Sequence, residues 1–236
     1  RQWYKKALDT DLARPKFAIM NPEITYTLPD YQTQCGCADI MMHTMERYFV
    51  LEDTMEITDK IAQDVMKNVM KYAKILKKDP ENYEARAEIM WCGSLSHNGL
   101  TGCGTCGGDW ATHLMEHELG GMFDVAHGAG LAAVWGSWAR YVMDEKPERF
   151  AQFAVDVMGV EESDDVKSTA LKGIEAVEEF YRMIEMPTNM KELGINPTDE
   201  QIKDMAMKAT NHDTQQLGAF KKLSAKDLVE IYKTAK

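Results

Sequence analysis

Histidine and aspartate side chains occur in this sequence at spacings that could bind a metal ion. Asp39 and His43 are four residues apart, so in a helix both side chains lie on one face, about one turn apart. His113 and His117 repeat this spacing, and His127 follows them. A carboxylate and an imidazole on one helix face can bind a single divalent ion together. The spacing indicates a metal site without selecting its ligands, because a lone helical histidine is more often a hydrogen-bonded structural residue.

The same histidines allow a second interpretation, a zinc peptidase. His113-Leu-Met-Glu116-His117 matches the H-x-x-E-H pattern, in which both histidines bind zinc and the glutamate activates water as a general base. The match is short, offers no obvious third ligand and leaves Asp39, His43 and His127 unused. It is therefore the weaker hypothesis.

The cysteines allow a third interpretation. Cys35-x-Cys37 and Cys103-x2-Cys106 could supply a zinc site with four thiolates, but no second C-x2-C accompanies the first pair. The total of 5 cysteines is odd, and no secretion signal precedes them. We therefore expect free thiols and a reducing, cytoplasmic location.

The composition limits the classes of partner. The 236 residues are 44% hydrophobic and 28% charged, which is typical of one large globular domain. A formal net charge of −11 argues against nucleic acid or an anionic membrane surface as the main partner. The sequence has no apolar run long enough for a transmembrane helix.

The pattern of apolar residues predicts a mainly α-helical protein. Residues 16–28 are the only convincing strand material, and they lie within an extended leading segment, residues 1–31. Residues 32–236 are predicted to form one helical domain, with breaks at the glycine-rich residues 99–108, at Gly120-Gly121 and at Gly194. The predicted helices are 32–50, 56–78, 81–96, 109–121, 126–144, 163–185, 198–210 and 224–235.

Several stretches of the sequence match a single family pattern. They are Lys16 to Pro29, Asp39-x3-His43-Thr-x-Glu-x-Tyr48, Met90 to Leu100, Asp109-Trp-Ala-Thr-His113-x3-His117-Glu-Leu through His127-Gly-Ala-Gly-Leu-Ala132, Pro187-Thr188, and Gly218 to Ser224. In these stretches the chain resembles the iron-containing (group III) alcohol dehydrogenases, especially their butanol dehydrogenase-like branch. The match covers nearly the whole chain. It implies the multi-helix, C-terminal metal-binding domain of that fold.

The resemblance also implies roles for individual residues. The metal ligands of the family fall on Asp39, His43, His113 and His127. The family equivalent of His117 stands beside the nicotinamide, where it is a candidate for proton relay or ring positioning, so His117 is not a ligand in this interpretation. Thr27 is expected to touch the cofactor.

The resemblance implies the reaction as well. The expected cofactors are a divalent metal, with Fe²⁺ usual in the family and Zn²⁺ also suited to this ligand set, and NAD or NADP. The expected substrates are a primary alcohol and its aldehyde. The metal would polarise the substrate oxygen while hydride passes to or from the nicotinamide.

The sequence departs from the family pattern in two places. The match begins partway through the pattern, so we expect an N-terminal dinucleotide-binding domain of roughly 150 residues to be missing from this chain. The isolated chain should then bind metal with little or no turnover. Gly136 stands where the family commonly has proline, which is expected to loosen its helix. A homodimer is the expected assembly, and a stand-alone helical metal-binding module is the alternative function.

Overall fold

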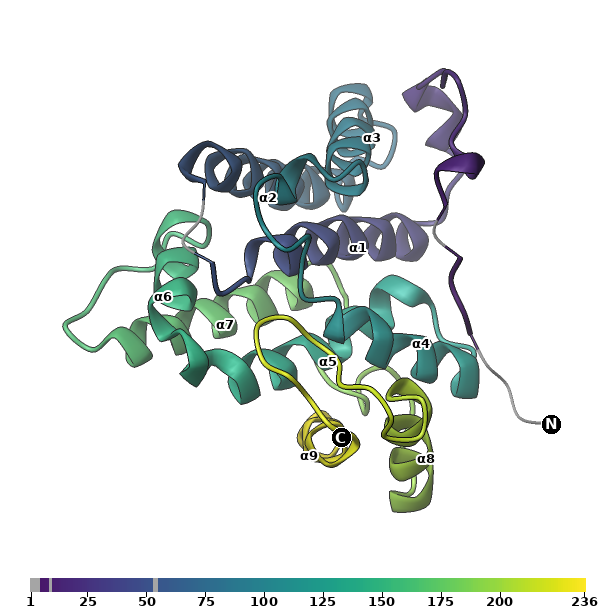
Figure 1. Ribbon diagram of the computed structural model, residues 1–236. Helices are drawn as coiled ribbons and strands as arrows, with labels where there is room; N and C mark the ends of the chain where they lie inside the picture. The colour runs from purple at the N-terminus through teal and green to yellow at the C-terminus, as the bar shows by residue number, and fades with distance from the viewer. Residues whose placement is uncertain (1–4, 9, 53–54) are drawn as a thin grey trace.

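The computed structural model describes residues 5–8, 10–52 and 55–236, and this part of the chain is helical with no sheet (Figure 1). A single isolated bridge joins Leu217 and Leu223. The short 3-10 helices are η1 (Asp11–Ala13), η2 (Pro22–Thr25), η3 (Leu100–Gly102) and η4 (Met143–Glu145). The α-helices are α1 (Asp30–Tyr48), α2 (Glu56–Leu76), α3 (Tyr83–His97), α4 (Ala111–Phe123), α5 (His127–Val142), α6 (Pro147–Asp156), α7 (Val166–Met183), α8 (Asp199–Ala209) and α9 (Ala225–Thr234).

Helices α1 and α5 form the centre of the molecule. α1 packs against α2, α3 and α5, and α5 packs in turn against α4, α7 and α9. Every residue of α5 from Gly128 to Ala139 is buried, as expected for a helix that is apolar on all sides. An aromatic cluster that includes Phe49, Trp138 and Phe150 fills the space between α1, α5 and α6. The ends of α1 and α5 are therefore held in a rigid core.

Side-chain caps define several helix starts. Thr198 and Gln201 form a capping box at α8, and Ser224 and Asp227 form another at α9. Asn82 caps α3 by accepting a hydrogen bond from the backbone N–H of Ala85. These caps agree with the helix starts expected from the sequence to within a few residues.

The expected strand between residues 16 and 28 is not present. Its centre is the 3-10 helix η2, and the preceding residues have no strand partner among the described residues. Phe17 and Ile19 are 79% and 85% exposed. The β-branched and aromatic residues there satisfy the strand propensity, but a strand also needs a neighbour to accept its backbone hydrogen bonds.

Two other expectations are corrected. Helix α6 was not predicted, although Phe150, Phe153 and Ala154 have helical spacing and Pro147 suits a helix start; its ten residues are short for recognition by periodicity. Gly120 and Gly121 do not end α4, which continues to Phe123 and ends at a left-handed Asp124. Glycine lowers helix propensity by only about 1 kcal/mol, which tertiary packing can offset.

Gly136 does not interrupt its helix, since α5 runs unbroken through it. A Cβ atom at this position would overlap the carboxylate of Glu178, which forms a bidentate ion pair with Arg140. The glycine thus leaves room for the Glu178 carboxylate beside α5. None of the helices in the described part of the chain is long and apolar enough to cross a membrane.

Candidate metal centre

Helix α1 carries three residues of the site. Asp39 and His43 lie one turn apart on the same face, as their spacing predicted, with 3.7 Å between Asp39 Oδ1 and His43 Nε2. Glu46 lies on the same helix and is fully buried. Because α1 is packed against other helices on several sides, these three side chains have little freedom to move.

Helix α4 is held in place by Asp109. The carboxylate of Asp109 accepts hydrogen bonds from the backbone N–H groups of Ala111, Ala219 and Phe220, at 3.0, 2.7 and 2.8 Å. Its own backbone N–H donates to the carbonyl oxygen of Glu46 at 2.9 Å. These bonds join the start of α4 to α1 and to the loop before α9. They bring His113, in the first turn of α4, over Asp39.

Helix α5 brings the last histidine to the cluster. His127 is the first residue of α5, and Gly128 follows it. A Cβ atom at Gly128 would overlap the carbonyl oxygen of Cys35 in α1. Only glycine lets the start of α5 come this close to α1, and so lets His127 reach Asp39.

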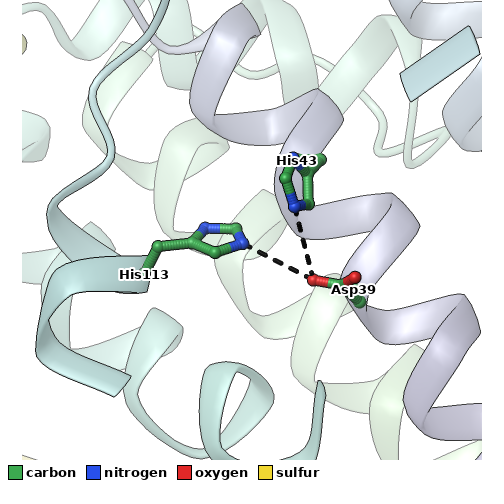
Figure 2. A group of neighbouring side chains, drawn as sticks. All are labelled: Asp39, His43 and His113. Atoms are coloured by element: carbon green, nitrogen blue, oxygen red, sulfur yellow. Dashed lines mark ion pairs between the residues drawn. The ribbon is translucent and has the colours of Figure 1, made fainter. Parts of the chain in front are cut away.

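One oxygen of Asp39 is the meeting point of the cluster. Its Oδ1 atom lies 3.5 Å from Nε2 of His113 and 3.5 Å from Nε2 of His127, besides its 3.7 Å approach to His43. Figure 2 shows how His43 and His113 point at this oxygen from two different helices. The four residues come from α1, α4 and α5, and their side chains meet at this oxygen.

These separations suit ligands of one metal ion. Two ligand atoms that each lie about 2.1 Å from a tetrahedral metal are about 3.4 Å apart, whereas a hydrogen bond between such atoms is about 2.9 Å long. Asp39 Oδ1 and His113 Nε2 are moreover buried without a hydrogen-bond partner. Unpartnered buried polar atoms are costly in a folded protein. A cation at this point would satisfy both atoms, so the residues present fit a divalent metal.

The outer nitrogens of two histidines are held by buried glutamates. His113 Nδ1 bonds to Glu46, and His127 Nδ1 bonds to Glu116. Glu46 also accepts a hydrogen bond from the backbone N–H of His113 at 3.2 Å. A carboxylate on the outer nitrogen turns Nε2 of each imidazole toward the centre and raises its basicity.

Burial and neighbouring charges shift the pKa values of the residues in the cluster. Burial alone would raise the pKa of Asp39, but contacts with His113, His97 and His43 outweigh it and hold that pKa well below its usual range. Burial lowers the pKa of His43 to about 3. Burial opposes the charged form of His113 as well, but the charge of Glu46 outweighs it and raises the pKa to about 9.

His117 lies beside this cluster and is half-buried. Its ring centroid is 5.8 Å from that of His127, and it lines a pocket of about 320 Å³ together with Lys5, Leu114 and Lys208. Burial, followed by the charge of Lys5, lowers the pKa of His117 to about 4. The imidazole is therefore neutral at pH 7. Thr27 lies exposed in the turn before α1.

The two histidines of the H-x-x-E-H pattern do not belong to one group of potential metal ligands. The ligand atoms of His113 group with Asp39 and His43, whereas those of His117 group with Glu116 and His127. Glu116 is also held by Lys5 at 2.8 Å. A peptidase would need both histidines of the H-x-x-E-H pattern on one ion and a free glutamate, so this geometry does not favour it.

The cysteines form no zinc site in the described residues, and all are free, as expected. Cys35, Cys37 and Cys92 are buried, whereas Cys103 and Cys106 are exposed in the glycine-rich loop. No group of potential metal ligands in the described part of the chain includes a cysteine. Burial raises the pKa of Cys37 to about 12, so this thiol stays protonated and inert.

Sequence reasoning missed two contributors to the site. Glu46 lies three residues after His43, a spacing that could have placed it on the same face of the helix. His97, at the end of α3, lies 3.5 Å from Asp39 through its Nε2 atom, and nothing in its local sequence indicated this contact.

Comparison with known proteins agrees with the helical fold. The model of the Fe-containing alcohol dehydrogenase family, C-terminal part, matches residues 33–236. NADH-dependent butanol dehydrogenase A of Clostridium acetobutylicum is 34% identical over 230 residues, which cover 97% of this chain and 58% of that protein. NADPH-dependent aldehyde reductase YqhD of Escherichia coli is 31% identical over 233 residues, which cover 98% of this chain and 59% of that protein.

A solved structure gives the same result. NADH-dependent butanol dehydrogenase A of Thermotoga maritima superimposes with a TM-score of 0.89 at 33% identity, covering 97% of this chain and 58% of that one. The chain therefore belongs to the Fe-containing alcohol dehydrogenase family and contains its C-terminal, helical part. It spans a little under three fifths of the length of these relatives.

Proposed function

We propose that this chain is the metal-binding part of an NAD(P)-dependent dehydrogenase that interconverts a primary alcohol and its aldehyde. Asp39, His43, His113 and His127 would hold one divalent ion. The observation that carries the proposal is the buried, unpartnered Oδ1 atom of Asp39, which faces the Nε2 atoms of three histidines. The names of the relatives, NADH-dependent butanol dehydrogenases and an NADPH-dependent aldehyde reductase, support the reaction class.

The donor set suits either iron(II) or zinc. Three neutral imidazoles and one carboxylate are borderline ligands that leave a divalent ion a net positive charge. The family description favours iron. A divalent ion at this site supplies Lewis acidity toward an alcohol or carbonyl oxygen.

The residues around the ion have separate tasks in this proposal. Glu46 and Glu116 keep the Nε2 atoms of His113 and His127 turned inward. His117 is neutral and lines the adjacent pocket, so its imidazole can accept the proton that an alcohol releases, or position the nicotinamide. Thr27 is proposed as a contact of the cofactor.

The remaining wall of the active site is proposed to come from a dinucleotide-binding domain on the N-terminal side. In this proposal residues 1–31 are the junction with that domain and residues 32–236 are the helical domain. Leu12, Phe17 and Ile19 support it, because they are 95%, 79% and 85% exposed. Apolar side chains gathered on one exposed segment are typical of a surface that another domain covers. A cytoplasmic homodimer is the proposed state of the complete protein.

Metal analysis of anaerobically purified protein tests the ligand assignment. The wild-type chain is expected to bind one Fe²⁺ or Zn²⁺. His127→Ala should lose the metal, because its Nε2 atom points at Asp39 Oδ1, whereas His117→Ala should retain it. The reverse pattern, with metal lost from His117→Ala and kept by His127→Ala, would support the peptidase and overturn the assignment.

Turnover tests the division between domains. The metal-loaded chain is expected to reduce butanal with NADH or NADPH only at background rate, because half of the cleft is proposed to lie elsewhere. The same chain, preceded by the coding region upstream of Arg1 in its gene, should show turnover. Rapid turnover by the 236 residues alone would contradict the proposal. An upstream region without a dinucleotide-binding fold would favour the stand-alone metal-binding module.

A further inference from the structure

Two of the five cysteines are exposed and lie three residues apart in the sequence. Cys103 and Cys106 are exposed, whereas Cys35, Cys37 and Cys92 are buried, and all five are free thiols in this structure. The proposed metal centre contains none of them. The segment Cys103-Gly-Thr-Cys106 therefore has no part in the function proposed above.

Hydrogen bonds anchor the loop that carries these two cysteines at both of its ends. The carbonyl oxygen of Cys103 accepts a hydrogen bond from the hydroxyl of Thr58 in α2, at 3.0 Å. At the other end, the backbone N–H of Asp109 donates to the carbonyl oxygen of Glu46 at 2.9 Å. Residues 104, 106 and 107 between these anchors are exposed. This part of the loop can change shape while the helices on either side keep their places.

The backbone between the two cysteines is folded into a turn. The N–H of Thr105 donates to the carbonyl oxygen of Gly102 at 3.3 Å, and Cys103 has φ −62° and ψ 129°. Gly104 follows with φ +85°, so the turn is of type II. The chain bends again at residues 105–107. A disulfide requires Cα atoms roughly 4.4–6.8 Å apart, and a turn followed by a bend favours such a separation.

The loop has the freedom that closing a disulfide requires. Cys106 is followed by Gly107 and Gly108, whose φ angles are +92° and +120°. The thiols hold only weak hydrogen bonds. The Sγ atom of Cys103 lies 3.6 Å from the carbonyl oxygen of Gly99, and that of Cys106 lies 4.0 Å from the carbonyl oxygen of Gly108. A thiol is a weak donor, so losing these contacts costs little.

We propose that Cys103 and Cys106 are a redox-active pair that closes to a disulfide by exchange with a low-molecular-weight disulfide such as oxidised glutathione. One cysteine thiolate attacks the glutathione disulfide, forms a mixed disulfide and releases one glutathione. The second cysteine thiolate then attacks the protein sulfur of the mixed disulfide and releases the other glutathione. The two protein thiols lose two electrons, one oxidised glutathione is reduced to two thiols, and both protons pass to those thiols.

The second step outruns the addition of a second glutathione because it is intramolecular. A connection of two residues keeps the resolving thiol at a high effective concentration beside the mixed disulfide. The reverse exchange with excess glutathione reopens the bond. The inference does not rest on the proposed function, since neither step involves the metal.

Trp110 connects this loop with the metal centre. Its indole Nε1 atom donates to the carbonyl oxygen of Gly107 at 3.1 Å. The centroid of its ring lies 5.3 Å from that of His43 and 5.4 Å from that of His113. Closing the disulfide moves Cys106 and the adjoining Gly107. The indole therefore reports the oxidation state of the pair at the edge of the metal centre.

Thiol labelling and intact mass of the full chain, before and after treatment with oxidised glutathione, test the proposal. The reduced native chain should react rapidly with N-ethylmaleimide at two thiols, and at five after denaturation. Oxidised glutathione should remove both rapid thiols and lower the mass by two hydrogen atoms, and dithiothreitol should restore them. Tryptophan emission should change in parallel with the loss of the two thiols.

Single variants assign the bond. Cys103→Ser and Cys106→Ser should each gain one glutathione instead of an internal disulfide, because the resolving thiol is missing. Cys92→Ala is the matched control, since it removes a buried thiol and should oxidise as wild type does. Trp110→Phe should form the disulfide but lose the change in emission.

Either of two results would overturn the redox pair. One is a wild-type chain that gains two glutathiones without an internal bond, which would mean that the thiols do not meet. The other is a chain that keeps both rapid thiols after the treatment. If the disulfide forms while the emission of Trp110 stays the same, the connection to the metal centre is rejected.

Discussion

Two histidine–glutamate pairs support the cluster, and their surroundings differ. His113 and Glu46 are both buried, with side-chain exposures of 8% and 0%. His127 is 33% exposed, and its partner Glu116 is shared with Lys5, whose side chain is 35% exposed. The chemistry of the two pairs is the same, but one belongs to the core and the other lies at the open side of the site.

This difference in exposure suggests different roles for the two glutamates. Glu46 binds both the ring and the backbone N–H of His113, so it ties α1 to α4 as well as orienting a ligand. Glu116 orients His127 beside His117 and the pocket, where a substrate or cofactor has to enter. We infer that the buried pair holds the helices in register and that the open pair can adjust when other groups approach.

Replacement of the buried glutamate is expected to have the largest effect. Glu46→Gln keeps the shape of the side chain but places an amide N–H₂ against one of the two N–H groups of His113, because these groups bond to different oxygens of Glu46. Metal affinity should fall about 10- to 100-fold, and the free energy of unfolding of the metal-free protein by roughly 1–3 kcal/mol. Metal titration and urea denaturation measure the two effects. A variant with unchanged stability would contradict the structural role of this pair.

Replacement of the open glutamate should have a smaller effect. In Glu116→Gln the amide oxygen can still accept from His127, and Lys5 can turn to solvent. The loss of metal affinity is expected to be about 10-fold, the lower end of the outer-shell range, with little change in the free energy of unfolding. The two variants make the same chemical change. An equal loss of stability in Glu116→Gln and Glu46→Gln would therefore show that the buried and the open pair do not differ in their structural role.

The third effect concerns the pH dependence of stability and involves Glu118, which lines the same pocket as His117. Burial raises the pKa of Glu118 to about 7, although the charge of Lys208 opposes the rise. The folded state then binds more protons than the unfolded state between pH 4.5 and 7, so this stabilising contribution is lost as the pH rises through 7. Glu118→Gln cannot ionise, and it should gain stability relative to wild type between pH 5 and pH 8. Urea denaturation at both pH values checks this, and an unchanged difference would show that Glu118 has an ordinary pKa.

Much of the helical fold was predictable from periodicity and capping residues. Helices such as α2, α7 and α9 have a clear apolar face and defined ends, and they appear where the sequence predicted them. The segment around Phe17 was not predictable, because a strand depends on whether a distant segment provides a partner, and none does so in the described part of the chain. Helix α6 was overlooked although its buried apolar residues have helical spacing.

The sequence by itself determined the local parts of the site. The four-residue spacing of Asp39 and His43 places both on one helix face through the geometry of the α-helix alone. Only the tertiary structure decided which histidines meet at Asp39 and which oxygen each one faces. Those contacts depend on the close approach of α5 to α1 at Gly128 and on the bonds of Asp109 between distant segments. Spacing along a helix is a local property, whereas the convergence of three helices on one oxygen depends on the packing of the whole core.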